Sequence, residues 1–238
     1  MKKICLTVMV AALTLGSAWS GSIKGKVTFE GKGPKDTPIQ MNADPNCVAM
    51  HAGEKVMTQK MVIAEDGGLQ WVFVYIKEGL DGKTFDPPAE PVVFDQKGCQ
   101  YQPHVFGIQV GQPLKIHNSD ATLHNVHIMP KENKEINIST PFQNFEIEQK
   151  FDKPEIMVTI KCDVHKWMEA YCGVLPHPFF AATAADGTYS IEGIPAGNYK
   201  LAFWQRMCEE QVIDVTVDDG DNTQDFKFDR SMARGGPK

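Results

Sequence analysis

Short apolar runs recur along the chain, and turn residues separate them. Residues 23–29 alternate apolar with small or polar positions, and residues 69–76 form an apolar run rich in β-branched and aromatic residues. Asp186-Gly187 and Pro195-Ala196-Gly197-Asn198 are typical turn sequences between later runs. No stretch shows the period of an amphipathic helix. The pattern predicts an all-β chain of β-sandwiches, with strands over 23–29, 69–76, 105–110, 114–118, 124–129, 155–162, 171–175, 188–191, 199–204, 212–217 and 223–228.

Length and turn composition limit the possible domain organisation. The 238 residues suffice for one large or two modest domains, and 15 prolines and 20 glycines favour many turns. Pro176-His177-Pro178 is a natural boundary. We expect a leader over 1–20, an N-terminal strand and irregular segment over 21–60, a sandwich over 61–176, a smaller sandwich over 177–228 and a disordered tail over 229–238.

The first twenty residues have the form of a secretory signal. Lys2 and Lys3 precede an apolar stretch from Ile4 to Leu15, and Ala18-Trp19-Ser20 is an acceptable cleavage site. No later stretch is long enough to span a membrane. We therefore expect an exported, periplasmic and soluble protein. Loss of the two lysines takes the formal net charge from −6 to −8, which disfavours nucleic-acid binding.

Soft metal ligands are concentrated in two motifs. Cys162, His165 and Met168 follow one another at intervals of three residues, and His124 and His127 lie upstream in a predicted strand. Two imidazoles, one thiolate and one weak thioether are the ligand set of an electron-transfer copper site. Residues three apart in a strand point to opposite faces, so only one upstream histidine can face this metal. We assign His124, which lies nearer the preceding loop.

Two other interpretations stay open at this point. A structural zinc site would use both upstream histidines with Cys162 and His165, but it would leave Met168 without a role. Alternatively, each of these residues is an ordinary structural one. A methionine- and histidine-rich segment over 41–61 could also bind copper, although filling gaps at the edge of a core is the commoner role of methionine.

Two sequence stretches together resemble the cupredoxins. Residues 101–128 followed by 161–175 are similar to the amicyanin type, with its short Cys-x2-His-x2-Met loop. The resemblance implies a Greek-key β-sandwich that binds one copper ion, and that Asn125 holds the two ligand loops together. Asp163 and Lys166 depart from the family pattern and are expected to tune the site, Asp163 by favouring Cu(II). The implied copper ligands are His124, Cys162, His165 and Met168.

The same resemblance implies how electrons would leave the site. In this family they pass through the second histidine, usually exposed, which is His165 here. Trp167 and Pro176 are expected to form an apolar docking surface around it. The expected partners are a c-type cytochrome or another periplasmic oxidoreductase.

The C-terminal third resembles a second family. Residues 182–204 are similar to carboxypeptidase regulatory-like, transthyretin-like β-sandwich modules, which implies a fold and no activity. Residues 21–34 resemble the first strand of such a module. The copper domain is therefore expected to be inserted between that strand and the rest of the module.

The mature chain retains five of the six cysteines, and export favours disulfides. If Cys162 binds metal, four remain for two bridges. Cys47 and Cys99 flank the first sandwich strands and are expected to pair, and a Cys172–Cys208 bridge would join the two domains. A second metal site from Cys99, His104 and His51 is a weaker alternative.

The sequence therefore predicts an exported blue-copper electron carrier, and not an enzyme, because four protein ligands leave no open metal position. The alternatives are a periplasmic copper chaperone or storage protein, and a carbohydrate- or surface-binding module.

Overall fold

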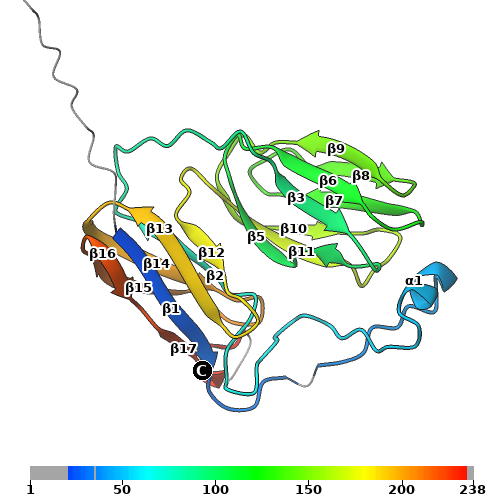
Figure 1. Cartoon of the computed structure of the whole chain (residues 1–238), viewed down its shortest axis with the longest axis horizontal. Helices are drawn as coiled ribbons and strands as arrows, with labels where there is room; N and C mark the ends of the chain where they lie inside the picture. The colour runs from blue at the N-terminus through cyan, green and yellow to red at the C-terminus, as the bar shows by residue number, and fades with distance from the viewer. Residues whose placement is uncertain (1–20, 35, 235–238) are drawn as a thin grey trace, which may run out of the picture.

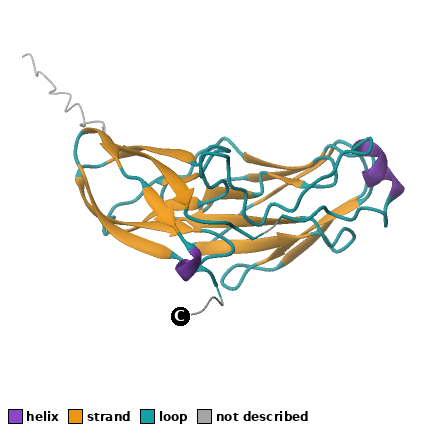
Figure 2. Ribbon diagram, turned by 90° about the horizontal axis from the view of Figure 1, so that it is seen from below, coloured by secondary structure: helices purple, strands orange, loops and turns teal. Residues whose placement is uncertain are grey.

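The computed structural model describes residues 21–34 and 36–234, and strands dominate it (Figure 1 and Figure 2). The described residues contain one α-helix, α1 (Pro45–Met50), and one 3-10 helix, η1 (Arg230–Met232). The all-β prediction is confirmed. No helix in the described part of the chain is long and apolar enough to cross a membrane. The predicted signal over 1–20 lies outside the described residues.

Nine consecutive strands form the sandwich that we call the central sandwich. Its larger sheet has the order β5-β11-β10-β7-β8 and its smaller sheet the order β4-β3-β6-β9. Apolar side chains from both sheets fill the core between them. The strands are β3 (Val92–Gln96), β4 (Tyr101–Gln102), β5 (Val105–Gln109), β6 (Leu114–Asn118), β7 (His124–Met129), β8 (Ile136–Thr140), β9 (Phe145–Gln149), β10 (Glu155–Lys161) and β11 (Glu169–Leu175).

The remaining strands form the terminal sandwich, from both ends of the chain. One sheet has β1 between β13 and β16, with β17 also paired to β1, and the other has the order β12-β2-β14-β15. The first strand thus pairs with C-terminal strands, and Val27 and Leu201 belong to one apolar core. The strands are β1 (Gly21–Phe29), β2 (Phe73–Glu78), β12 (Phe180–Ala182), β13 (Thr188–Ile194), β14 (Gly197–Trp204), β15 (Gln211–Val217), β16 (Gly220–Thr223) and β17 (Phe226–Phe228).

The strand expected over 69–76 lies in a different domain from the one we anticipated. It forms β2 and pairs with β12 and β14 of the terminal sandwich, not with the central sandwich. Val74 and Ile76 point into the terminal core, whereas Phe73 and Tyr75 belong to an apolar cluster shared with the central sandwich. Because both faces of β2 are buried, its continuous apolar pattern could not reveal which sandwich it joins.

Aromatic side chains join the two sandwiches. Phe73 and Phe180 lie over Gly173 and Gly107 of the central sandwich. A Cβ atom at Gly173 would come within 2.4 Å of the Phe73 ring, and one at Gly107 within 2.3 Å of the Phe180 ring. The close approach of the two sheets therefore depends on these two glycines lacking side chains.

The predicted Cys172–Cys208 disulfide is wrong. Both cysteines are free and buried, Cys172 in the central core and Cys208 in the terminal core. The side chains point into separate cores, so no bridge can form between them. The expected tail is also partly ordered, since η1 follows β17 and Arg234 donates a hydrogen bond to the carbonyl of Cys208 (2.8 Å).

A long connection, residues 37–61, runs along the central sandwich and carries α1 at its far end (Figure 1). We call it the strap. Asp44 caps the helix by accepting the backbone N–H of Asn46 (2.8 Å), and Pro45 fits the first helical position. The expected Cys47–Cys99 disulfide is present and ties α1 to the central sandwich.

Candidate metal centre

Three of the predicted ligands meet at one end of the central sandwich. His124 begins β7, while Cys162 and His165 lie in the loop between β10 and β11. The backbone N–H of Cys162 donates to the Met168 carbonyl (3.2 Å), and that of Met168 donates to the His165 carbonyl (2.9 Å). These bonds close the loop into a tight turn, so residues spaced three apart face the same point.

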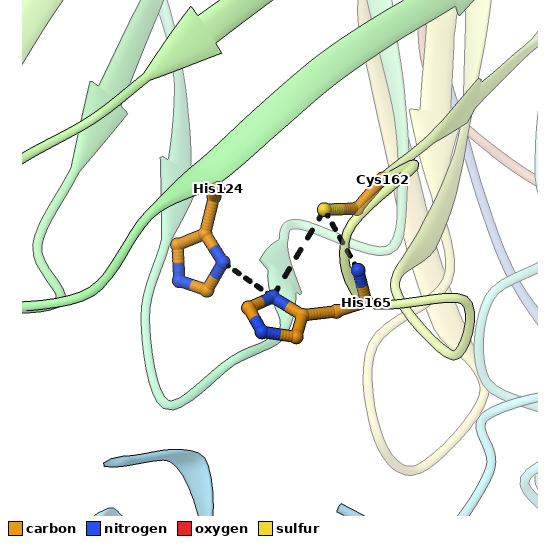
Figure 3. A group of neighbouring side chains, drawn as sticks. All are labelled: His124, Cys162 and His165. Atoms are coloured by element: carbon orange, nitrogen blue, oxygen red, sulfur yellow. Dashed lines mark hydrogen bonds between the residues drawn. The ribbon is translucent and has the colours of Figure 1, made fainter. Parts of the chain in front are cut away.

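The donor atoms of these three side chains converge (Figure 3). His124 Nδ1 lies 2.8 Å from His165 Nδ1, and Cys162 Sγ lies 4.0 Å from His165 Nδ1. One ligand atom from each residue lies within 4.8 Å of the others, and all three residues are buried. A single small ion could contact all of them.

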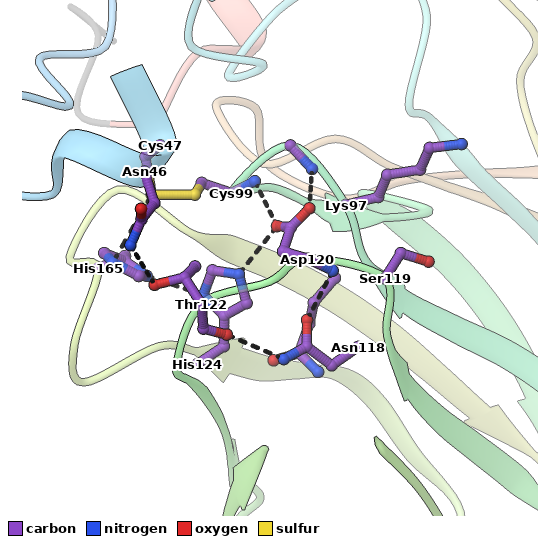
Figure 4. Close-up of polar contacts among 12 residues, drawn as sticks. Asn46, Cys47, Lys97, Cys99, Asn118, Ser119, Asp120, Thr122, His124 and His165 are labelled. Carbon is purple, nitrogen blue, oxygen red and sulfur yellow. Dashed lines mark hydrogen bonds and ion pairs between the residues drawn. A yellow bond between two sulfur atoms is a disulfide. The ribbon is translucent and has the colours of Figure 1, made fainter. Parts of the chain in front are cut away.

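Each histidine has a carboxylate on its far side, and Figure 4 shows the one beside His124, Asp120. His124 Nε2 lies 2.9 Å from an Asp120 oxygen, and His165 Nε2 lies 3.0 Å from an Asp44 oxygen. An ionised carboxylate only accepts, so each Nε2 carries the hydrogen. The two Nδ1 atoms then lie 2.8 Å apart, close enough for one proton shared between the rings or for one metal ion in contact with both. The donor set therefore fits a metal ion.

Electrostatics keep the two carboxylates charged. Burial alone would raise the pKa of Asp120, but hydrogen bonds from His124 and from the backbone N–H groups of Cys99 and Gly98 outweigh it and lower the pKa. The pKa of Asp44 is lowered in the same way by Asn46, His165 and Thr122. Negative charge behind each imidazole orients the ring and raises its basicity toward a metal.

The surroundings of Cys162 favour the thiolate form of its side chain. Burial alone would raise the pKa of its thiol, but hydrogen bonds from His124, His165 and the backbone outweigh burial and lower the pKa to about 6. The backbone N–H of His165 donates to Sγ (3.3 Å). At neutral pH the group is thus in the form that binds metals.

Asn125 joins the two ligand-bearing segments. Its Oδ1 accepts the backbone N–H groups of Asp163 (2.7 Å) and Val164 (3.4 Å) and lies 3.2 Å from Cys162 Sγ. The carbonyl of Asn125 also accepts the buried Tyr101 hydroxyl. This residue therefore fixes the loop of residues 162–168, which we call the metal loop, against β7.

The other predicted residues divide between the core and the surface. Met168 is 2% exposed and shares the central core with Cys162. His127 lies on the outer face of β7, where it pairs with Glu135 and Asp163. Asp163 is largely exposed, and Lys166 more so. Asp163 therefore acts on the site from outside, through Asn125, to which its carboxylate also bonds (3.3 Å).

The expectation of an exposed His165 is wrong. His165 is 1% exposed because α1 and the disulfide lie over its Nε2 edge, with Cys47 Sγ at 3.7 Å. Trp167 and Pro176 do not lie next to each other around His165 either. They flank the two ends of β11, whose seven residues span roughly 20 Å.

The alternative second metal site is not assembled. Cys99 is in the disulfide, His51 Nε2 bonds the Gly98 carbonyl (2.8 Å), and His104 Nδ1 bonds the Glu169 carbonyl (2.9 Å). The methionines of the strap are also dispersed. Met41 lies in the central core and Met61 in the terminal core.

Sequence reasoning missed both carboxylates. Asp120 had a local signal, since it precedes His124 by four residues and lies in the same loop. Asp44 had only the Asp-Pro pattern of a helix start, and 121 residues separate it from His165.

No family model matches the sequence, and no curated protein matches it. Solved structures show partial similarity. The copper-containing nitrite reductase from Thermus scotoductus SA-01 is 20% identical over 41% of this chain and 24% of its own, with a TM-score of 0.32. A purple cupredoxin from Nitrosopumilus maritimus is 19% identical over 34% of this chain and 97% of its own (TM-score 0.29).

An amicyanin variant in the Cu(I) form is 18% identical over 42% of this chain and 97% of its own (TM-score 0.32). The chain spans only about a quarter of the nitrite reductase. Any assignment of the metal centre therefore rests on its own side chains.

Proposed function

We propose that the protein is an exported type 1 copper protein that transfers single electrons between periplasmic redox partners. The observation that carries this proposal is the convergence of His124, Cys162 and His165, which each bring one ligand atom within 4.8 Å of the others in a buried site where the pKa of the thiol is lowered to about 6. Imidazole and thiolate together favour copper. We assign the ligands as His124, Cys162, His165 and Met168.

The protein's contribution is rigidity. Asp120 and Asp44 hold the two imidazoles by Nε2, Asn125 holds the metal loop, and the disulfide holds the strap over His165. Bound copper would supply a one-electron couple between Cu(I) and Cu(II). Fixed ligands keep the rearrangement between the two states small, which is what an electron carrier requires.

Burial argues against a copper-chaperone role. His124, Cys162, His165 and Met168 are each no more than 2% exposed. A chaperone must pass its ion to ligands of a partner, so at least one of its own ligands must be reachable. Four protein ligands would also leave no position for a substrate, so we propose electron transfer without catalysis.

The partner would be a c-type cytochrome or another periplasmic oxidoreductase. Because α1 covers His165, the surface nearest to that ligand belongs to the strap and not to the histidine. Trp167 packs against His165 with ring centroids 5.0 Å apart, and its indole N–H donates to the Cys99 carbonyl (3.0 Å). We propose that the partner docks over α1 and the metal loop.

The test is Cu(II) addition to the copper-free chain. A thiolate ligand gives an intense visible charge-transfer band, and Cys162→Ser should abolish this band while the fold is retained. Cys172→Ser, at a buried free thiol on β11, is the matched control and should keep the band. A colourless Cu(II) complex, or a band that survives Cys162→Ser, would refute the proposal.

A further inference from the structure

A cavity of about 310 Å³ opens where the strap, the metal loop and the terminal sandwich meet. Its walls include Lys60 of the strap, Lys166 and Trp167 of the metal loop, and Arg206, which follows β14. The volume is in the range of small-molecule sites. None of the four side chains serves the metal centre as a ligand.

The charge of the cavity is opposite to that of the protein. Three cationic side chains line it, Lys60, Lys166 and Arg206, and Glu169 is the one acidic residue among its lining residues. The whole chain has a formal net charge of −6. A local excess of positive charge in an acidic protein favours an anion and disfavours a second metal ion.

Arg206 has unused hydrogen-bonding capacity. Its Nη2 donates to Glu169 (2.9 Å), and its guanidinium lies over the Tyr171 ring at 5.5 Å. Its Nη1 is buried and has no hydrogen-bond partner. A buried donor without a hydrogen-bond partner is energetically unfavourable. The planar guanidinium group can donate two parallel hydrogen bonds to the two oxygens of a carboxylate.

His104 supplies the complementary group. It is 5% exposed, and its Nδ1 donates to the Glu169 carbonyl (2.9 Å), so the proton is on Nδ1 and the lone pair on Nε2. Burial lowers the pKa of His104 to about 4 and keeps the ring neutral. Its Nε2 has no partner among the described residues, and edge contacts with Trp71 and Tyr171 fix the ring.

Arg206 and His104 share two neighbours, Tyr171 and Glu169. Arg206 packs on the face of Tyr171, His104 meets the same ring at its edge (5.7 Å), and Glu169 bonds both residues. The lining of the cavity therefore combines a cationic hydrogen-bond donor, Arg206, with a neutral hydrogen-bond acceptor, His104. A carboxylate alone would satisfy the first group and leave the second without a partner.

We propose that this cavity binds a small hydroxycarboxylate anion. Its carboxylate accepts from Arg206 and is attracted by Lys60 and Lys166, and its hydroxyl group donates to His104 Nε2. Since Trp167 and Met168 form another part of the wall, the bound anion contacts the metal loop. Binding itself does not require copper.

Calorimetric titration of the copper-free, full-length chain tests the proposal. The probes are L-malate and succinate, which share a four-carbon dicarboxylate skeleton and differ by the hydroxyl group. We expect malate to bind about fivefold more tightly, as for one additional net hydrogen bond. Equal affinities, or no binding of either anion, would overturn the proposal.

Three variants assign the contacts. Arg206→Gln should weaken both anions about tenfold or more. His104→Phe keeps an aromatic ring between Trp71 and Tyr171 and should erase the preference for malate. Lys200→Gln, an exposed lysine paired with Asp214 away from the cavity, is the control and should change neither affinity. An Arg206→Gln variant that is folded and binds malate normally would refute the site.

If Arg206→Gln does not fold, Arg206→Lys keeps the charge without the fork and should still lower malate affinity. The comparison of malate with succinate on the unaltered chain decides the matter independently of any variant. Because copper is absent throughout, this result does not depend on whether the protein carries electrons.

Discussion

The Cys47–Cys99 disulfide is the only covalent link between the strap and the central sandwich in the described part of the chain. It closes a loop with a sequence separation of 52 residues. On the chain-entropy model, a loop of this length restricts the unfolded state by about 4 kcal/mol at 25 °C. We therefore expect reduction of this bond to lower the free energy of unfolding by about 4 kcal/mol.

The measurement is urea unfolding of the copper-free chain, followed by circular dichroism, with and without a reductant. For a chain of this size the change corresponds to a fall in Tm of roughly 10 °C. Using one chain in two redox states avoids the buried polar group or cavity that a substitution would introduce. The other cysteines in the described part of the chain, Cys162, Cys172 and Cys208, are free, so this disulfide is the bond there on which the reductant acts.

The matched control is Cys47→Ala with Cys99→Ala. This variant should unfold at one urea concentration whether or not the reductant is present. Reduction should also increase hydrogen exchange in residues 37–61, because the hydrogen bond from His165 to Asp44 then holds α1 without covalent help. A change in unfolding free energy below about 1 kcal/mol on reduction of the unaltered chain, or an equal change in the control, would refute the reasoning.

Three further predictions concern other parts of the fold. Asn125→Ala removes the acceptor of two backbone N–H groups of the metal loop and should cost about 2–3 kcal/mol in urea unfolding, with Asn125→Asp costing less. Gly173→Ala would place a Cβ 2.4 Å from the Phe73 ring and should cost about 1–3 kcal/mol, a result that unchanged thermal unfolding would contradict. Burial lowers the pKa of His104 and of His177 to about 4, so between pH 6.5 and 4 the unfolded chain binds more protons than the folded one. Stability should therefore fall on acidification through this window, by up to about 1.4 kcal/mol per pH unit for each histidine, and a double glutamine variant should show a flatter pH profile.

The sequence determined the strand content and identified side chains that can bind a soft metal. Where one face of a strand is buried, alternating apolar and polar residues bounded by turn residues indicate that strand. The spacing of Cys162, His165 and Met168 places three side chains that can bind a soft metal in one short loop. Strand parity separated His124 from His127, and in the structure the first is buried beside His165 and the second lies on the outer face. These features depend on residues close together in the chain, so local patterns reveal them.

The tertiary structure decided which distant residues meet. Strand β2 is apolar on both faces, so its sequence pattern fits either sandwich. Only its pairing with β14 shows that it belongs to the terminal sandwich. The count of cysteines suggested a disulfide between Cys172 and Cys208, yet their side chains enter different cores. Asp44 bonds His165 from 121 residues away, and this segment buries a side chain that the sequence led us to expect at the surface. Such contacts arise from packing between segments remote in the chain, and no local pattern encodes them.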